Sequence, residues 1–324
     1  MVELDAVHGR ERPTPKRRRT FWWGLLALGL VTAIWGYSNV VIRELELSLP
    51  PAAFLLLRYG LVGVFALPWV LRGPRIHAKA WAGGLATGVF LAGTTLTQAI
   101  AMRSISVDSV AFITAVYVVL TPLAMALWQH HRPHRIVIAA TWASLLGVAL
   151  LIGHVDVTAA VGTLWALAAA IFATVQIIGT AEVSRVMTTL QLAVIEALGA
   201  AITLAIYLAV TGQLTHHLFI GLALHLSGPV IWRLGYLAVL GTLVAGWLQV
   251  WGQRRLTATE AALVFNLEPV WTAVFSWLVL SQFLLWLQLL GAGLILASLM
   301  ALSFTAEDAA DLEILDPKPP YREH

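Results

Sequence analysis

The chain has 324 residues, of which 59% are hydrophobic and only 11% charged, whereas roughly 25% are charged in ordinary soluble domains. This composition excludes an ordinary soluble protein and points to the membrane. The chain has no cysteine, which excludes a disulfide framework and thiolate metal sites. The net charge of +3 is less informative than the placement of the charges along the chain.

Apolar stretches of about 20 residues, the length that spans a bilayer as a helix, recur along the chain. We expect ten, at about 21–42, 52–71, 80–102, 107–128, 136–153, 160–180, 188–210, 232–252, 258–280 and 284–304. Their connections are short except for residues 216–229, which we expect to lie partly in the membrane interface. The sequence predicts an all-α integral membrane protein of ten transmembrane helices, with a basic tail at 1–20 and an acidic tail without structure at 305–324.

Lysine and arginine are distributed unevenly between the two sides of such a bundle. With the N-terminus in the cytoplasm, Arg43, Arg103 and Arg233 lie outside and Arg58 lies within the membrane. The other 16 of the 20 are cytoplasmic: Arg10, Arg12, Lys16, Arg17, Arg18, Arg19, Arg72, Arg75, Lys79, Arg132, Arg135, Arg185, Arg254, Arg255, Lys318 and Arg322. Cytoplasmic loops carry an excess of these residues. The bias predicts a multi-pass protein of the cell (inner) membrane with both termini cytoplasmic.

Short matches in the same order link the two halves of the chain. Ile34–Asn39 matches Ile171–Gln176, Arg103 with Asp108 matches Arg255 with Glu260, Val119–Pro122 matches Asn266–Pro269, and Leu145–Leu150 matches Leu289–Leu294. Each half, 21–153 and 160–304, then holds five helices. Because five is odd, the second half crosses the membrane in the opposite orientation, an inverted repeat typical of secondary transporters.

Glu268 and Pro269 interrupt the apolar segment 258–280. A charged side chain within a bilayer normally faces a protein interior or a water-filled cavity. Proline cannot donate a hydrogen bond to the carbonyl of Phe265, and such freed backbone is tolerated only where protein or a polar cavity satisfies it. The pair, with the neighbouring Asn266, therefore predicts a polar site inside the membrane.

These residues also carry a family resemblance. Trp35-Gly36-Tyr37-Ser38-Asn39, Arg58, residues 111–122, residues 261–269 and residues 287–297 resemble the EamA-type transporters of the drug/metabolite transporter superfamily, over about residues 21–304. The resemblance implies two inverted five-helix repeats and movement of small metabolites, often export. The Leu-Gly-Glu that is common in the family between helices 9 and 10 is replaced here by Leu280-Ser281-Gln282-Phe283. If that glutamate closes a gate in relatives, this chain must close it with other residues.

Thirteen polar or aromatic residues of the predicted helices are candidates for a substrate site. They are Trp35, Tyr37, Ser38, Asn39, Arg58, Gln98, Tyr117, Gln176, Glu196, Gln249, Asn266, Glu268 and Trp271. Each has a structural alternative, because polar residues of membrane bundles most often make interhelical hydrogen bonds. Arg58 can also extend toward the outer headgroups, and Glu196, its approximate equivalent in the second repeat, can serve structural pairing alone.

Two other groups of residues have local explanations. Asp108 and Glu260 lie at helix starts, where a carboxylate offsets the exposed N–H groups. Thr257-Ala258-Thr259-Glu260 fits a capping box, so we assign both acidic residues to capping. His130, His131 and His134 lie close to Arg132 and Arg135 and predict a solvated basic turn rather than a metal site.

We predict a secondary transporter that moves a small metabolite by alternating access, with export as the expected direction. Trp35, Tyr37, Tyr117, Trp247 and Trp271 suggest an aromatic cavity suited to an amino acid or a similar amphipathic compound. The expected partners are this substrate and the lipid bilayer, with no cofactor, metal or nucleic acid. No G-x-x-x-x-G-K-[ST] motif occurs, so direct use of ATP is not expected. Burial disfavours the ionised form of a carboxylate, which makes Glu196 and Glu268 the candidates for coupling to protons.

Two alternatives belong to other functional classes. One is a membrane-embedded enzyme, for which the chain lacks the H-E-x-x-H, paired-aspartate and G-x-S-x-G motifs. The other is a channel or a scaffold without transport activity, to which a polar midplane in an inverted repeat is less suited.

Overall fold

The computed structural model describes residues 15–46, 50–105, 107–129, 135–152, 159–213, 227–280 and 285–313. All regular structure in these ranges is helical. The elements are α1 (Pro15–Glu46), α2 (Pro51–Leu71), α3 (Ala78–Ala101), α4 (Val107–Thr114), α5 (Tyr117–Gln129), α6 (Arg135–Ile152), α7 (Ala160–Val183), α8 (Thr189–Val210), α10 (Gly228–Ala238), the π-helix η1 (Val239–Val244), α11 (Ala245–Gln253), α12 (Ala258–Phe265), α13 (Glu268–Leu280) and α14 (Trp286–Glu313). The histidine turn, residues 281–283 and most of the 216–229 connection lie outside the described residues.

Within these ranges the elements form ten helical units at the ten predicted places. Helices α4 and α5 share one predicted segment, as do α10, η1 and α11, and also α12 and α13. Seven segments of the described chain are long and apolar enough to span a membrane, and Arg135–Leu151 and Trp286–Ala301 are shorter apolar helices. The predicted all-α membrane fold is confirmed, and length and composition support seven of the ten predicted spans.

Two helices extend beyond their predicted ends. Helix α1 begins at Pro15 instead of residue 21, and α14 continues to Glu313 instead of ending at 304. The prediction that the acidic tail lacks structure is therefore wrong for residues 305–313. This stretch is rich in alanine and glutamate, which are good helix formers, so a helix can continue where the apolar pattern stops.

Two helical units are interrupted at equivalent places. A break at residues 115–116 separates α4 from α5, and a break at residues 266–267 separates α12 from α13. All four boundaries of the second unit follow those of the first by the same offset, 151 residues (258 − 107 and 280 − 129). The sequence match of Val119–Pro122 with Asn266–Pro269 has an offset of 147 and is displaced by about one helical turn. Because residues four apart lie on one helix face, an apolar pattern cannot detect such a shift.

The two prolines consequently occupy different positions. Pro269 is the second residue of α13, where its missing N–H group costs little. Pro122 lies inside α5, and the break in its unit precedes it at Ala115 and Val116. The match of Val119–Pro122 with Asn266–Pro269 predicts a proline break at the same place in each half, and this prediction is wrong for the first half.

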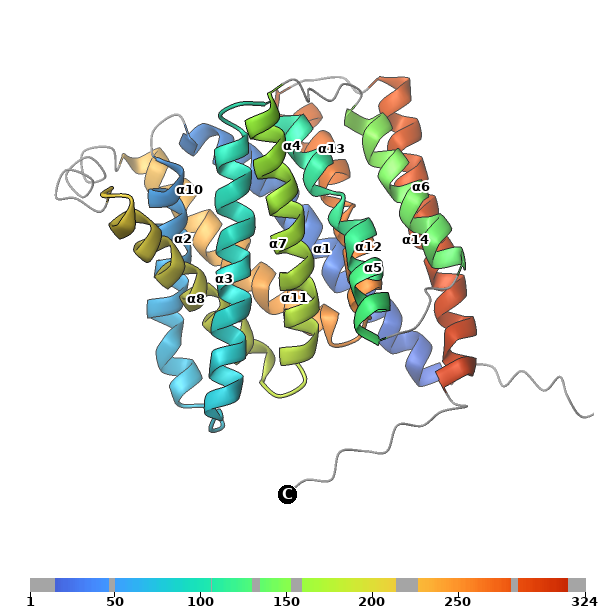
Figure 1. Cartoon of the computed structure of the whole chain (residues 1–324), viewed down its shortest axis with the longest axis horizontal. Coiled ribbons are helices and arrows are strands. Elements are labelled where there is room, and N and C mark those ends of the chain that lie inside the picture. Colours follow the sequence, from blue (N-terminus) through green and yellow to red (C-terminus); the bar gives the residue numbers. More distant parts are fainter. Residues whose placement is uncertain are drawn as a thin grey trace, which may run out of the picture.

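The helices stand side by side in a bundle whose two halves run in opposite directions (Figure 1). Helices α6 and α14 contact each other at one edge, and α2 contacts α8 near the other. Helix α3 begins at the lower edge of Figure 1 whereas α10 begins at the upper edge. Helix α1 begins and α14 ends at the lower edge. These directions agree with an inverted repeat.

Glycines permit close helix contacts at the junctions between the two halves. Gly88 of α3 lies against Gly199 and Ala200 of α8, and Gly147 of α6 lies against Gly291 of α14. A Cβ added to Gly88 would lie 2.8 Å from the backbone nitrogen of Ala200, and one added to Gly147 would lie 2.7 Å from the carbonyl oxygen of Gly291. Small residues let membrane helices approach in this way.

Gly88→Ala is expected to destabilise the protein, because the added methyl meets backbone atoms that cannot move out of its way. Overpacking of this kind typically costs roughly 1–3 kcal/mol, which thermal unfolding in detergent would measure. Gly60→Ala is the matched control, since a Cβ there has no neighbour within 4 Å. Equal unfolding temperatures for the two variants would contradict the assigned contact.

Candidate functional site

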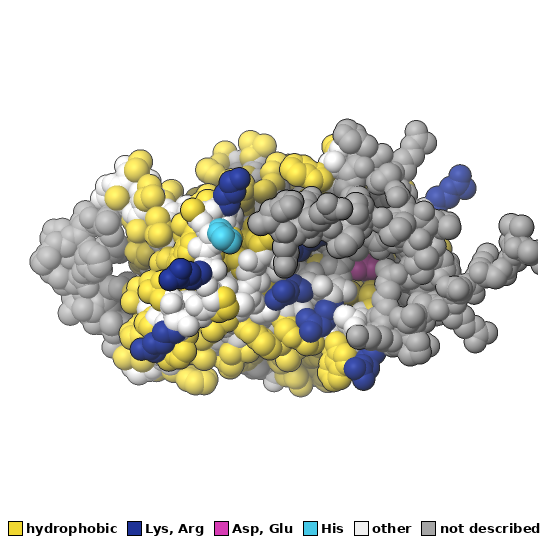
Figure 2. Space-filling model, turned by 90° about the horizontal axis from the view of Figure 1, so that it is seen from below, with side chains coloured by type: hydrophobic (Ala, Val, Ile, Leu, Met, Phe, Trp, Pro, Cys, Tyr) yellow, Lys and Arg dark blue, Asp and Glu magenta, His cyan; other side chains and the backbone are white. Residues whose placement is uncertain are grey.

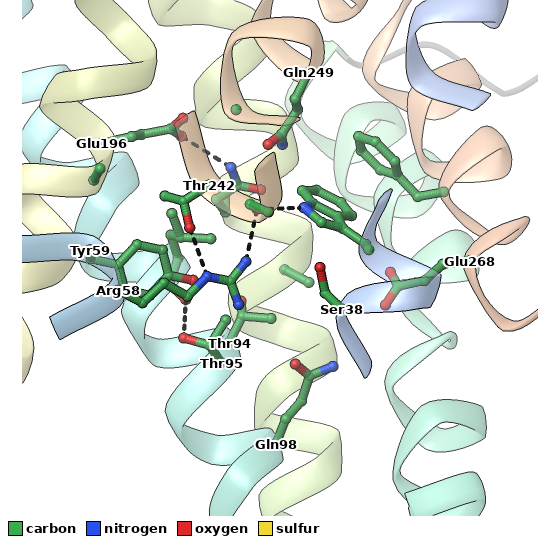
Figure 3. A pocket seen from close by; sticks show the side chains of 18 of the residues that line it. Ser38, Arg58, Tyr59, Thr94, Thr95, Gln98, Glu196, Thr242, Gln249 and Glu268 are labelled. Carbon is green, nitrogen blue, oxygen red and sulfur yellow. Dashed lines mark hydrogen bonds between the residues drawn. The ribbon is translucent and has the colours of Figure 1, made fainter. Parts of the chain in front are cut away.

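A cavity lies in the middle of the bundle, where the two halves meet. Its volume is about 160 Å³, which is room for several waters or a small metabolite. Helices α1, α2, α3, α4, α5, α7, α8, α11, α12 and α13 and the π-helix contribute to its wall. Its polar lining residues are Ser38, Asn39, Arg58, Thr94, Thr95, Gln98, Thr114, Tyr117, Gln176, Glu196, Thr242, Gln249 and Glu268, nine of which are labelled in Figure 3.

Ten of the thirteen candidate residues line this cavity, and three do not. Tyr37 packs edge-on against Tyr236 and Phe275, at centroid distances of 5.2 and 5.4 Å. Asn266 is fully buried at the helix break, where its Nδ2 donates to Ser144 Oγ over 2.9 Å. Trp271 is 36% exposed and stacks on Phe275. Whether the ten lining residues bind a substrate stays a prediction.

The cavity is less aromatic than the sequence suggested. Of the five aromatic residues proposed for it, Trp35 and Tyr117 line it. Trp247 is 39% exposed and stacks on Trp251, away from the cavity lining. Tyr59 and Phe265 line the cavity instead, and no feature of their sequence positions distinguishes them from core aromatics.

Arg58 of α2 points into the bundle and not toward the headgroups. Its side chain is only 6% exposed. Its Nε donates to Thr242 Oγ1 over 2.7 Å, and its Nη2 donates to the carbonyl oxygen of Gly241 over 2.8 Å (Figure 3). The alternative in which Arg58 extends to the membrane surface is thereby excluded for this conformation.

The partners of Arg58 come from the π-helix η1, which the sequence did not predict. Thr242 Oγ1 donates to the carbonyl oxygen of Leu237 five residues earlier, over 2.8 Å. The carbonyl oxygen of Gly241 accepts from Arg58 and also from Trp35 Nε1, over 3.2 Å. Short π-helices are frequent at functional sites, because they alter where backbone groups point. Here the carbonyl oxygen of Gly241 in the π-helix accepts hydrogen bonds from both α1 and α2 at the cavity wall.

Glu196 of α8 is buried and held by neutral partners from α7. Its Oε1 accepts hydrogen bonds from Gln176 Nε2, over 3.0 Å, and from the hydroxyl of Thr180. Gln176 Nε2 also lies 3.1 Å from Thr180 Oγ1. Thr180 lies 16 residues before Glu196 and does not line the cavity, so nothing in the sequence pointed to it.

Glu268 is the first residue of α13, directly after the helix break. Its Oε1 accepts from Asn39 Nδ2 over 2.9 Å, and the same amide lies 3.1 Å from Thr272 Oγ1. A carboxylate at the start of a helix also faces the positive end of the helix dipole. The break therefore places a carboxylate at the cavity and provides part of its stabilisation.

The charged groups of the cavity are not neutralised by one another. In the part of the chain that the structure describes, no ion pair joins Arg58 to Glu196 or Glu268. Each is held instead by amide, hydroxyl or carbonyl groups. The arrangement leaves charge of both signs available at the wall of one cavity, which suits a small compound that carries complementary charges.

The capping assignment for Glu260 is confirmed. Glu260 N donates a hydrogen bond to Thr257 Oγ1 over 3.2 Å, and Thr257 N donates to Glu260 Oε2 over 2.7 Å. This is the reciprocal capping box that starts α12. The side chain of Asp108 lies outside the described residues.

Comparisons with known proteins identify the architecture. Residues 22–153 and 160–304 each match the EamA-like transporter family. An uncharacterised transporter of Archaeoglobus fulgidus is 27% identical over 282 residues, covering 86% of this chain and 85% of the relative. A crystal structure, described only as that of a protein, superposes with a TM-score of 0.71 at 16% identity, covering 90% of this chain and 99% of the solved one, and thus shares the fold. The chain belongs to the EamA-like transporter family and is a multi-pass membrane transporter.

Proposed function

We propose that the protein is a secondary transporter that moves an amino acid or a similar small amphipathic metabolite by alternating access. The observation that carries this proposal is the cavity between the two repeats, in which Arg58 and the carboxylates Glu196 and Glu268 are each hydrogen-bonded to neutral partners. In inverted-repeat transporters the substrate site lies where the repeats meet, near broken helices. The break before Glu268 and the π-helix beside Arg58 are such features.

The chemistry of the wall favours a zwitterionic compound. The guanidinium of Arg58 is suited to a carboxylate, which it can bind through two parallel hydrogen bonds. The carboxylates of Glu268 and Glu196 are suited to an ammonium group. Trp35, Tyr59 and Phe265 supply apolar surface for the rest of the molecule.

Orientation follows from the basic residues of one face. Arg72, Arg75, Lys79, Arg185 and Arg254 are exposed in or beside the connections α2–α3, α7–α8 and α11–α12. Figure 2 views the bundle from this side and shows Lys and Arg spread over it. We call it the basic face and assign it to the cytoplasmic side of the inner membrane. The proposed direction of transport is export.

Flux into sealed vesicles tests the proposal directly. Purified protein in proteoliposomes should take up label from a pool of radiolabelled amino acids faster than protein-free vesicles, and unlabelled amino acids inside should accelerate this uptake by exchange. Flux that does not saturate with concentration would indicate a channel instead. An absence of flux, with the protein folded and correctly inserted, would favour the alternatives of a membrane-embedded enzyme or a scaffold.

Both termini and the basic face are expected on the cytoplasmic side. A reporter fused after His324 should therefore be active in the cytoplasm, whereas a reporter inserted between His216 and Pro229 should be active outside. Sixteen of the 20 Lys and Arg residues support this orientation. An external reporter at His324, or a cytoplasmic one in the 216–229 connection, would refute it.

Any coupling to protons is expected to involve Glu196 or Glu268. Both line the cavity, and the hydroxyl of Thr180 and the amides of Gln176 and Asn39 can pair with a carboxylate or with a carboxylic acid. Glu196→Gln or Glu268→Gln should therefore remove the pH dependence of flux, measured across vesicles with an imposed pH gradient. A dependence that survives in both variants would rule out this route.

A further inference from the structure

Two glutamines of the cavity occupy equivalent positions in the two repeats. The 151-residue offset that relates α4–α5 to α12–α13 also relates Gln98 of α3 to Gln249 of α11. Gln98 lies three residues before the end of its helix at Ala101, and Gln249 lies four before Gln253. Because α3 and α11 run in opposite directions, the two side chains approach the cavity from opposite ends (Figure 3).

Neither amide is hydrogen-bonded within the described part of the protein. Both line the cavity, and Gln249 is only 4% exposed. A buried amide without a partner costs free energy unless water or a ligand satisfies it. In Figure 3 the two amides extend toward the space around Arg58 from either end of the view.

The other amides near the cavity behave differently. Asn39 and Gln176, which are equivalent in the two repeats, donate to Glu268 and Glu196 respectively. Gln253, one turn beyond Gln249, is 2% exposed and donates to the carbonyl oxygen of Ile177 over 3.1 Å. These three have the interhelical bonds expected of structural residues. Gln98 and Gln249 form the equivalent pair that is left without such bonds.

We propose that Gln98 and Gln249 are side-specific substrate contacts of the transport cycle. Gln249 hydrogen-bonds the substrate while the cavity is open to the basic face, and Gln98 does so while it is open to the opposite face. An amide suits this role because it donates and accepts, and can therefore pair with carboxylate, carbonyl, hydroxyl or ammonium groups. The inference rests on the proposed alternating access. It adds that Gln98 and Gln249 are the residues whose exposure to the two faces changes during the cycle.

The absence of native cysteine allows a direct test of this exposure. Gln98→Cys and Gln249→Cys each introduce one thiol, and a membrane-impermeant maleimide is applied to one face of sealed vesicles at a time. Gln249→Cys should react about tenfold faster from the basic face, and Gln98→Cys about tenfold faster from the opposite face, since each is open in one state. In the double variant, prior reaction at one position should slow reaction at the other several-fold. Preferred reaction of both from the same face, or independent reaction in the double variant, would overturn the inference.

Gln253→Cys is the matched control for folding. It is buried on the same helix but does not line the cavity. It should remain unreactive from both faces, and reactivity there would show that labelling reports unfolding. In that event, flux of the variants Gln98→Leu and Gln249→Leu decides whether each residue contacts the substrate from one face.

Flux measurements distinguish a residue that contacts the substrate from one that is only exposed to the solvent. With the radiolabelled amino acid pool, Gln249→Leu should slow transport that starts at the basic face about tenfold more than transport in the reverse direction, and Gln98→Leu should do the opposite. Gln253→Leu should leave the ratio of the two directions unchanged. Symmetric effects would refute the assignment even if amino acid flux itself is confirmed. If the native chain moves no label, the maleimide rates still decide whether the two positions alternate.

Discussion

Arg58→Ala is expected to abolish flux while the protein remains folded and inserted. The guanidinium is the fixed positive charge of the described cavity wall, and Nη1 is not used by its two protein acceptors. A hydrogen bond to a charged group contributes roughly 1.5–3 kcal/mol, so loss of a two-bond contact should lower flux by about 100-fold or more. Initial rates of amino acid uptake in proteoliposomes, normalised to inserted protein, would measure this.

Arg58→Lys separates charge from geometry. Lysine keeps the positive charge but cannot reproduce the planar, two-bond contact of a guanidinium, so it should rescue flux only in part. It also cannot donate to Thr242 and Gly241 with the same fixed spacing. Full activity of Arg58→Ala would show that the guanidinium only supports the π-helix and that the anionic group of the substrate binds elsewhere.

The fold was largely predictable because its dominant determinant is hydropathy. Backbone groups in lipid must be satisfied internally, so each long apolar segment has to be a helix. This constraint located all ten helical units, and a coarse repeat was visible in Leu145–Leu150 and Leu289–Leu294, whose glycines, Gly147 and Gly291, contact each other. Helix ends were less predictable, as the extension of α14 to Glu313 illustrates.

The exact register of the repeat was not predictable from short matches. A displacement of four residues keeps the same helix face, so pairing Pro122 with Pro269 and pairing Tyr117 with Glu268 give nearly the same apolar pattern. Only the helix breaks distinguish them, and they favour the second pairing. The correct register matters for function, because it is the one that relates Gln98 to Gln249.

The types of residue in the candidate site were predictable, but which of them face the cavity was not. Trp35, Ser38 and Asn39 face the cavity, whereas Tyr37 faces Tyr236, as expected for positions about 100° apart on a helix. No pattern in the sequence indicates in advance which of these side chains faces the cavity. The π-helix was also beyond prediction, since its extra residue per turn leaves no mark on composition.

Charge in the cavity follows the repeat in position but not in sign. An offset of 138 residues relates Arg58 to Glu196, and an offset of 151 relates Tyr117 to Glu268. Equivalent positions therefore carry a cation and an anion, or a phenol and a carboxylate. A strictly symmetric cavity would place like charges together, which is unfavourable in a low-dielectric interior. The asymmetry permits both signs of charge to coexist around one bound molecule.

Glu268→Ala is expected to abolish flux, because it removes a carboxylate from the cavity wall together with the acceptor for Asn39. The remaining amide of Asn39 still has Thr272 Oγ1 within 3.1 Å, so α1 and α13 should stay packed. A loss of about 100-fold in amino acid uptake is expected by the same reasoning as for Arg58. Thermal unfolding of the purified variant would confirm that the fold persists.

Glu260→Ala is the matched control, eight residues earlier in the same helical unit and outside the cavity. It removes half of the capping box of α12, so it should lower the free energy of unfolding by about 1 kcal/mol. Flux per folded molecule should be unchanged, because Glu260 faces Thr257 at the helix start and not the substrate. A fully active Glu268→Ala, together with a folded but inactive Glu260→Ala, would mean that transport depends on the carboxylate at the helix start and not on the one at the break.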